Sequence, residues 1–138
     1  MLKVYCDTNV YVDMLRNRSD NLRPLGTFAH EFFADGWNCR FDLIVSDHLV
    51  NELKKQLNEK EYEELFDVFR KRNKFIFVNE KEGDWERARK MSSNVPDALH
   101  AILAQRAGAD MIVTRDDDFK EFNCPVKVSL PEHALDTF

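Results

Sequence analysis

The sequence predicts an α/β fold: one domain over residues 1–138, with a mostly parallel central sheet of about five strands and helices on both faces. Two observations predict this fold. Short apolar runs, rich in β-branched and aromatic residues, alternate with longer segments of helical periodicity. No linker rich in proline, glycine or serine interrupts that alternation. The length of 138 residues also fits the usual size of one domain, ~100–150 residues.

The strand-like runs are too short for helices, and the segments between them carry apolar stripes at helical spacing. In chain order, the expected strands are 2–6, 41–45, 75–78, 111–113 and 126–129. The expected helices are 8–16, 21–37, 46–57, 60–72, 84–91 and 96–108. Pro96 suits the first turn of the last helix, and Gly108 suits its end.

The composition describes a folded protein without a membrane segment. The chain is 43% hydrophobic with a net charge of −5, which argues against a general polyanion-binding protein. No run approaches the roughly 18 apolar residues of a membrane span, and the N-terminus resembles a strand rather than a signal peptide, so we expect a cytoplasmic protein. Cys6, Cys39 and Cys124 show no CxxC or Cys/His spacing, so we expect reduced cysteines and no zinc site.

Acidic residues follow several of the expected strands. Sites in open parallel sheets form at the carboxyl ends of the strands. Asp7 follows the first strand, Glu52 lies on the helix after the second, and Asp116 follows the fourth, so we expect them to converge. Two of these residues also have a simpler interpretation. Asp7 suits a helix N-cap. Glu52, at the border of its helix's apolar face, suits a solvated surface residue.

Asp97 begins a helix that is apolar nearly all round and is therefore expected to be buried. A buried carboxylate is costly unless it is hydrogen-bonded or metal-bound. The N–H groups at the start of the helix offer a purely structural alternative. His100, one turn later, could share a metal, but such a histidine more often packs in the core, and we do not include it among the ligands.

The run VTRDDDF, residues 113–119, places three aspartates side by side. If strand-like alternation continues, Asp116 and Asp118 share one side, Asp117 faces water and Phe119 enters the core. A solvated turn is the alternative. With Asp7 close by, however, the repulsion between these like charges favours a bound cation. Ligands that are all oxygen match a hard ion, Mg²⁺ or Mn²⁺.

Three segments together resemble the PIN-domain ribonucleases, a family that includes the toxins of VapBC-type toxin–antitoxin pairs. They are VYCDTNVYVDML, IVSDHLVNEL and PDALHAILAQRAGADMIVTRDDDF, and they span nearly the whole chain in the right order. The resemblance implies a catalytic set of four carboxylates: Asp7, Glu52, Asp97 and Asp116. It implies that these four and Asp118 hold Mg²⁺ or Mn²⁺, and that Thr8, Asn9 and Thr114 are the polar residues beside the substrate.

The resemblance implies metal-dependent hydrolysis of RNA phosphodiester bonds. RNA requires positive charge nearby, and the candidate phosphate contacts are Arg16, Arg18, Arg23 and Arg115. A toxin would have a small antitoxin partner whose tail covers the acidic cleft, and we expect a homodimer. A housekeeping RNA-processing nuclease would have the same sequence features.

Two alternatives come from other classes. A phosphohydrolase of the haloacid-dehalogenase type requires a second aspartate two residues after the first, where this chain has Asn9. A catalytically silent binding module would be favoured if one of the four carboxylates were missing, and all four are present.

Overall fold

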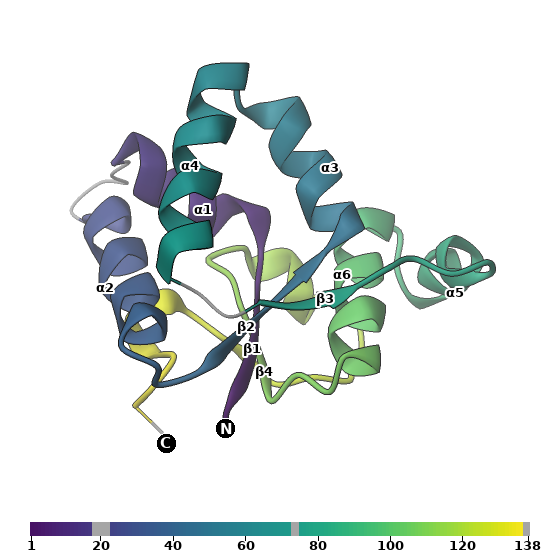
Figure 1. Cartoon of the computed structure of the whole chain (residues 1–138). Coiled ribbons are helices and arrows are strands. Elements are labelled where there is room, and N and C mark those ends of the chain that lie inside the picture. The colour runs from purple at the N-terminus through teal and green to yellow at the C-terminus, as the bar shows by residue number, and fades with distance from the viewer. Residues whose placement is uncertain (18–22, 73–74, 137–138) are drawn as a thin grey trace.

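In the computed structural model, which describes residues 1–17, 23–72 and 75–136, five strands form one sheet (Figure 1). The strands are β1 (Lys3–Cys6), β2 (Asp42–Ser46), β3 (Phe75–Val78), β4 (Met111–Val113) and β5 (Val128–Ser129). Their order is β3-β2-β1-β4-β5, and all four pairings are parallel. The predicted parallel α/β fold is therefore confirmed.

The helices follow the predicted alternation. They are α1 (Thr8–Arg16), α2 (Leu25–Trp37), α3 (Asp47–Gln56), α4 (Glu59–Arg72), α5 (Asp84–Met91) and α6 (Val95–Arg106), with short 3-10 helices η1 (Asp117–Lys120) and η2 (Pro131–His133). Several predicted boundaries differ from the structure by a few residues, and the differences at α2 and β5 have a clear physical reason. Helix α2 begins at Leu25, because Pro24 lacks the N–H that a helix interior requires. Strand β5 is only two residues long, because it pairs with the three-residue β4 alone.

The two faces of the sheet carry separate layers of helices (Figure 1). Successive side chains of a strand point to opposite faces, so Val4 and Cys6 of β1 pack in one core and Tyr5 in the other. Helices α1 to α4 cover the first face, and α5 and α6 cover the second. The expected cover on both faces is present.

Helix α6 is held from all sides by the second core. Its residues from Ala98 to Ala104 are all buried, as predicted from its apolar composition. A helix without a solvent face has little freedom to rotate, because rotation in either direction would break close packing. The polar side chains that α6 carries, Asp97 and His100, are therefore fixed inside the protein.

The topology brings three chain segments together at one edge. Strand β1 lies between β2 and β4, so the chain moves from β1 to one side and later returns to the other. The backbone N–H of Asp7 donates to the carbonyl of Val113 at 2.9 Å, which joins the ends of β1 and β4. This crevice is where ligand sites form in open parallel sheets. Among the described residues, no helix is long and apolar enough to cross a membrane.

Candidate active site

Asp7 both caps a helix and belongs to a buried polar site. Its Oδ1 accepts from the backbone N–H of Thr8 at 2.7 Å, as expected of the N-cap of α1. Its Oδ2 accepts from Thr114 Oγ1 at 2.9 Å and from Asn9 Nδ2 at 3.3 Å. Burial raises the pKa of Asp7 despite these contacts. Asp7 thus caps α1 with one oxygen and contacts the polar residues of the site with the other.

Asp97, Asp116 and Asp118 form a second part of the site. Each offers a carboxylate oxygen, and these oxygens lie within 4.8 Å of one another. The amide of Asn94 donates to Asp97 Oδ2 at 2.8 Å and to Asp118 Oδ2 at 2.9 Å, which links α6 to the turn after β4. The backbone N–H of Asp118 donates to Asp116 Oδ1 at 3.0 Å, which fixes the turn itself.

The three neighbouring aspartates separate as predicted. The side chain of Asp117 is 88% exposed, whereas Phe119 is buried and anchors the turn in the second core. Asp116 and Asp118 remain together on the inner side. The turn therefore presents two carboxylates to the site and one to water.

The carboxylates repel one another. Burial and the charges of Asp7, Asp116 and Asp118 outweigh the attraction of His100 and raise the pKa of Asp97 to about 7. The charge of Asp116 raises the pKa of Asp118 in the same way. A cluster of oxygen ligands that repel one another in this way fits a hard divalent ion. The residues present therefore fit Mg²⁺ or Mn²⁺.

Glu52 lies near enough to Asp7 for its charge to raise the pKa of that carboxyl, and it groups with His48 and His100 rather than with the three aspartates. Its Oε1 accepts from Thr8 Oγ1 at 2.7 Å and is 2.5 Å from Nε2 of His100. His100 is also 3.6 Å from Asp7 Oδ1, so it joins the two carboxylates. Burial raises the pKa of Glu52, but the hydrogen bonds from His100 and Thr8 lower it to about 2.

Several polar residues of the site were not foreseen from the sequence. His100, which sequence reasoning placed in the core, is fully buried but lies among the carboxylates. The hydroxyl of Tyr5 is 2.5 Å from His100 Nδ1 and 2.7 Å from Ser46 Oγ. Burial beside the charge of His100 lowers the pKa of His48 to about 4. The spacing of His100 from Asp97, one helical turn, was the available signal. Nothing comparable pointed to Tyr5 or Asn94.

The small polar residues that were expected beside the substrate donate hydrogen bonds to carboxylates of the site. Thr8 donates to Glu52, and Asn9 and Thr114 both donate to Asp7. Thr114 Oγ1 also accepts from the backbone N–H of Asp116 at 3.0 Å. All three lie in the site, and their described hydrogen bonds hold its acidic residues in place.

The predicted arginines lie in different surroundings. Arg16 donates to Glu61 at 2.9 Å and to the carbonyl of Gln56 at 3.0 Å, so the structure does not bring it to the acidic cluster. Arg18 lies outside the described residues. Nε of Arg115 donates to the buried Asp13 at 2.6 Å. A hollow of about 340 Å³ is lined by Arg23, Arg115, Lys120 and His133, together with the acidic Asp116 and Asp117.

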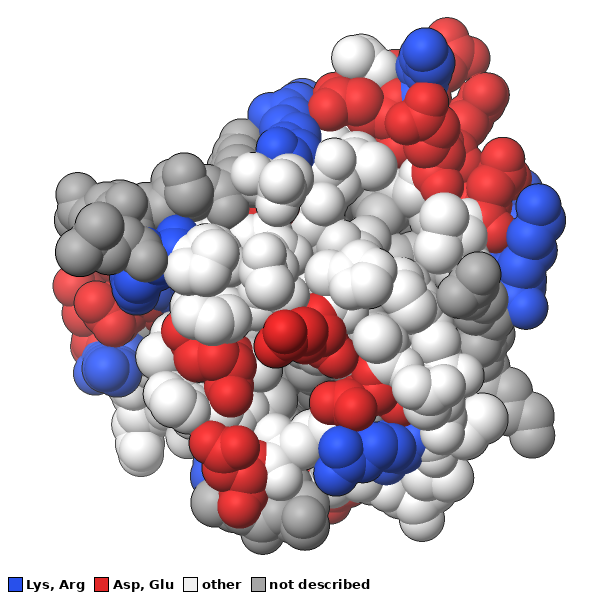
Figure 2. All heavy atoms as spheres, turned by 90° about the vertical axis from the view of Figure 1, so that its left-hand side faces the viewer, with Lys and Arg blue, Asp and Glu red and all other residues white. Residues whose placement is uncertain are grey.

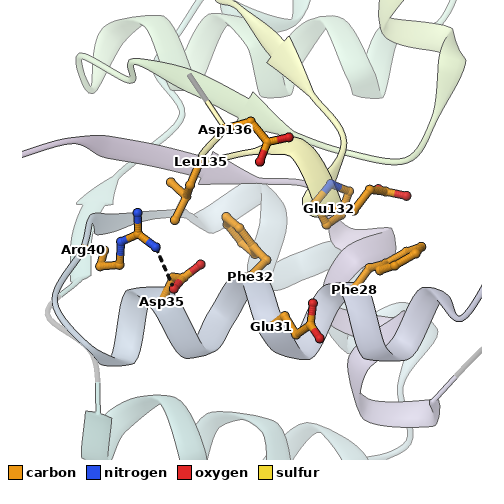
Figure 3. A pocket seen from close by; sticks show the side chains of 9 residues that line it. Phe28, Glu31, Phe32, Asp35, Arg40, Glu132, Leu135 and Asp136 are labelled. Carbon is orange, nitrogen blue, oxygen red and sulfur yellow. Dashed lines mark hydrogen bonds and ion pairs between the residues drawn. The ribbon is translucent and has the colours of Figure 1, made fainter. Parts of the chain in front are cut away.

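A second concave surface lies between α2 and η2. It has a volume of about 280 Å³, and its apolar lining includes Phe28, Phe32 and Leu135 (Figure 3). Acidic side chains stand around this hollow on the face shown in Figure 2: Glu31, Asp35, Glu132 and Asp136. Arg40 forms an ion pair with Asp35 at 3.2 Å. The acidic rim repels phosphate, so this α2–η2 hollow is not suited to nucleic acid.

Comparison with solved structures finds the same fold in three bacterial proteins. VapBC2 from Rickettsia felis, bound to a DNA fragment from its promoter, matches with a TM-score of 0.64 at 15% identity, covering 94% of this chain and 98% of that chain. FitAcB from Neisseria gonorrhoeae matches with a TM-score of 0.58 at 19% identity, covering 94% and 99%. VapC20 from Mycobacterium tuberculosis, a toxin that cleaves the sarcin–ricin loop, matches with a TM-score of 0.56 at 13% identity, covering 87% and 96%.

Comparison of the sequence with known protein families identifies the family of this chain. No curated protein matches it closely enough to count. The family model of the PIN domain, in contrast, matches residues 4–123, a stretch that includes every carboxylate of the site. The chain therefore belongs to the PIN-domain family.

Proposed function

We propose that this protein is a metal-dependent endoribonuclease that hydrolyses RNA phosphodiester bonds. The observation that carries the proposal is the group formed by Asp97, Asp116 and Asp118, whose oxygens lie within 4.8 Å of one another beside the buried Asp7, in a PIN domain. Such a group costs folding energy through repulsion. A function that requires negative charge at this edge of the sheet explains why it is there.

The fit of the ligands favours Mg²⁺ or Mn²⁺ held by Asp97, Asp116 and Asp118, with Asp7 and Glu52 beside them. When bound, such an ion activates water and stabilises charge on the phosphate oxygens. The protein's own contribution is orientation. Asn94 holds the carboxylates of Asp97 and Asp118, and Thr114 and Asn9 hold that of Asp7, so little rearrangement is required when substrate arrives.

The cationic hollow beside Asp116 supports the choice of a phosphate-bearing substrate. Arg23, Arg115 and Lys120 line it together with Asp116, so a phosphate bound there lies next to the acidic site. Phosphate contacts position a nucleic acid without reading its sequence. The acidic rim of the α2–η2 hollow makes that surface the less favourable one for a phosphate-bearing substrate.

We further propose that the protein is the toxin of a toxin–antitoxin pair, acts in the cytoplasm and forms a homodimer. Two of the structures with the same fold are VapBC2 and the toxin VapC20, and the latter cleaves the sarcin–ricin loop. A small antitoxin would then cover the acidic cleft. A housekeeping RNA-processing nuclease would use the same site without that partner.

The test is cleavage of a labelled structured RNA in the presence of Mg²⁺, Mn²⁺ or a chelator. We expect cutting that requires the metal, that Asp97→Asn abolishes, and whose rate at saturating RNA Asp117→Asn leaves unchanged. Asp117 is the matched control because it lies in the same acidic run but is exposed to water. Cutting that survives Asp97→Asn would refute the proposed site. A folded protein that binds Mn²⁺ and cuts no RNA would favour a silent binding module.

A further inference from the structure

A second group of potential ligands lies beside the acidic cluster. His48, Glu52 and His100 each offer one ligand atom, and these atoms lie within 4.8 Å of one another. The two imidazole rings are 4.3 Å apart between centroids. Both histidines are buried, at 5% and 0% exposure. Two imidazole nitrogens and one carboxylate differ from the oxygen-only set of the aspartates, and this is the donor set found in many catalytic zinc sites.

In each histidine, one ring nitrogen is already oriented by a nearby oxygen. Nε2 of His48 is 3.1 Å from the carbonyl of Pro96, and Nδ1 of His100 is 2.5 Å from the hydroxyl of Tyr5. A carbonyl only accepts, so Nε2 of His48 carries the proton and Nδ1 keeps a lone pair. Metal-binding histidines commonly donate their second N–H to an oxygen in this way.

Glu52, the remaining ligand, and Tyr5, which lies behind His100, are also held by hydrogen bonds. Thr8 Oγ1 donates to Glu52 at 2.7 Å, so the carboxylate is also oriented. Ser46 Oγ lies 2.7 Å from the Tyr5 hydroxyl and fixes it behind His100. Ligands held by such outer contacts require little reorganisation when an ion binds.

The group is reachable from solvent. A cavity of about 370 Å³ is lined by His48, Glu52, Trp85 and Pro96, among other residues. The Glu52 side chain is 25% exposed at its wall. An ion can therefore enter between Glu52 and His48 without opening the core.

We propose that His48, Glu52 and His100 bind one Zn²⁺ ion at a site distinct from the aspartate cluster. The ion takes the place of the proton between His100 Nε2 and Glu52 Oε1, which are 2.5 Å apart, and that proton leaves to solvent. Ligands of a tetrahedral zinc ion lie roughly 3.4 Å from one another, so this pair must open slightly. The third ligand, a ring nitrogen of His48, already lies within 4.8 Å of the ligand atoms of the other two.

The site would also regulate the nuclease, a consequence that rests on the function proposed above. Glu52 cannot serve the acidic cluster while it binds a separate ion. His100 is 3.6 Å from Asp7, so its movement also reaches the cluster directly. Zn²⁺ would therefore inhibit Mn²⁺-dependent cleavage.

The test is a Zn²⁺ titration of the full, metal-free chain in competition with a chromophoric chelator. We expect one tight site in the wild type, an affinity at least about 10-fold weaker in His48→Gln, and no change in Asp116→Asn. The reverse pattern, with loss only in Asp116→Asn, would show that zinc merely occupies the acidic cluster and would overturn the proposal. Thermal unfolding of each metal-free variant confirms that it is folded.

X-ray absorption of the zinc-loaded wild type tests the same site without a substitution. We expect two imidazole nitrogens at about 2.0–2.1 Å from zinc. A shell of oxygen alone would overturn the proposal. Neither measurement uses RNA. Zinc binding through His48 in a protein that cuts no RNA would therefore refute the proposed function and leave the zinc site standing.

Discussion

Two regions of this protein gather carboxylates, and they differ in how the carboxylates are held. At the ends of the strands, Asp97, Asp116 and Asp118 converge within 4.8 Å and are linked by Asn94. In the α2–η2 hollow, acidic side chains stand apart around an aromatic lining, and Asp35 is neutralised by Arg40 (Figure 3). The number of acidic residues is similar. Convergence and burial, which raise the pKa of Asp97, distinguish the proposed ion site from an acidic surface.

The largest expected difference between the two regions is in catalysis. Asp116→Asn should reduce RNA cleavage by roughly 100-fold or more, because it removes a ligand of the ion that would stabilise charge on the phosphate oxygens. Glu31→Gln in the α2–η2 hollow should leave the rate unchanged. Single-turnover cleavage with saturating Mn²⁺ measures both. Equal losses in the two variants would contradict the distinction.

For the stability of the fold, in contrast, we expect the larger effect in the α2–η2 hollow, at one of its aromatic residues. Phe32 is 2% exposed and stacks on Phe41 at 4.9 Å. Phe32→Ala should therefore lower the free energy of unfolding by about 3–5 kcal/mol. Glu31→Gln at the rim of the same hollow should change it by less than about 0.5 kcal/mol. Urea unfolding of the two variants checks this, and a mild effect of Phe32→Ala would show that the hollow can collapse around the loss.

The acidic cluster should also make the metal-free protein sensitive to pH. The folded protein holds the proton of Asp97 up to a pKa of about 7, whereas the ordinary value is 3.8. The stabilising contribution of protonated Asp97 to the free energy of unfolding is therefore fully present below about pH 4, and it is lost as the pH rises to 7. Asp97→Asn should be more stable than the wild type at pH 7.5, and the two should converge towards pH 4.

Thermal unfolding in chelator, recorded from pH 4 to pH 8, measures this difference. His48 has the opposite effect, because its pKa is lowered from 6.5 to about 4 and its contribution grows as the pH rises through that window. His48 is present in both proteins, so the difference between them isolates Asp97. A constant difference across the whole range would mean that the carboxylates do not repel one another.

The smallest expected effect concerns the cationic hollow beside Asp116. Lys120 is 78% exposed and pairs only weakly with Asp117, at 3.4 Å. Lys120→Gln should raise the KM for RNA by a few-fold and reduce the salt slope of binding by about 0.7, the value for one contact with single-stranded RNA. Arg40→Gln near the α2–η2 hollow is the matched control and should change neither. Arg115 is a poorer target, because its loss would leave the buried Asp13 unpaired.

Much of this arrangement could be predicted from the sequence, because periodicity reports burial directly. The apolar composition of α6 identified a buried helix, which the structure confirms. The alternation in the aspartate run also correctly separated Asp117 from its neighbours. These features depend on local spacing, which is visible along the chain.

What could not be predicted depends on distant contacts. His48 and His100 meet only because α3 and α6 pack at the same edge, and no spacing rule connects residues that far apart. The absence of a Cys/His motif therefore gave no information on a site of this kind. Arg16 is similar, since its pairing with Glu61 follows from how α1 packs near α4.

The most direct test of the account is the affinity of the metal-free protein for Mn²⁺, followed by electron paramagnetic resonance. Three chains are compared: the wild type, Asp97→Asn, and the double substitution Glu31→Gln with Glu132→Gln. The convergence of the three carboxylates predicts that Asp97→Asn weakens Mn²⁺ binding at least about 10-fold and that the double variant binds as the wild type does. Equal weakening in both variants, or loss in the double variant alone, would contradict the claim that the strand-end cluster is the metal site.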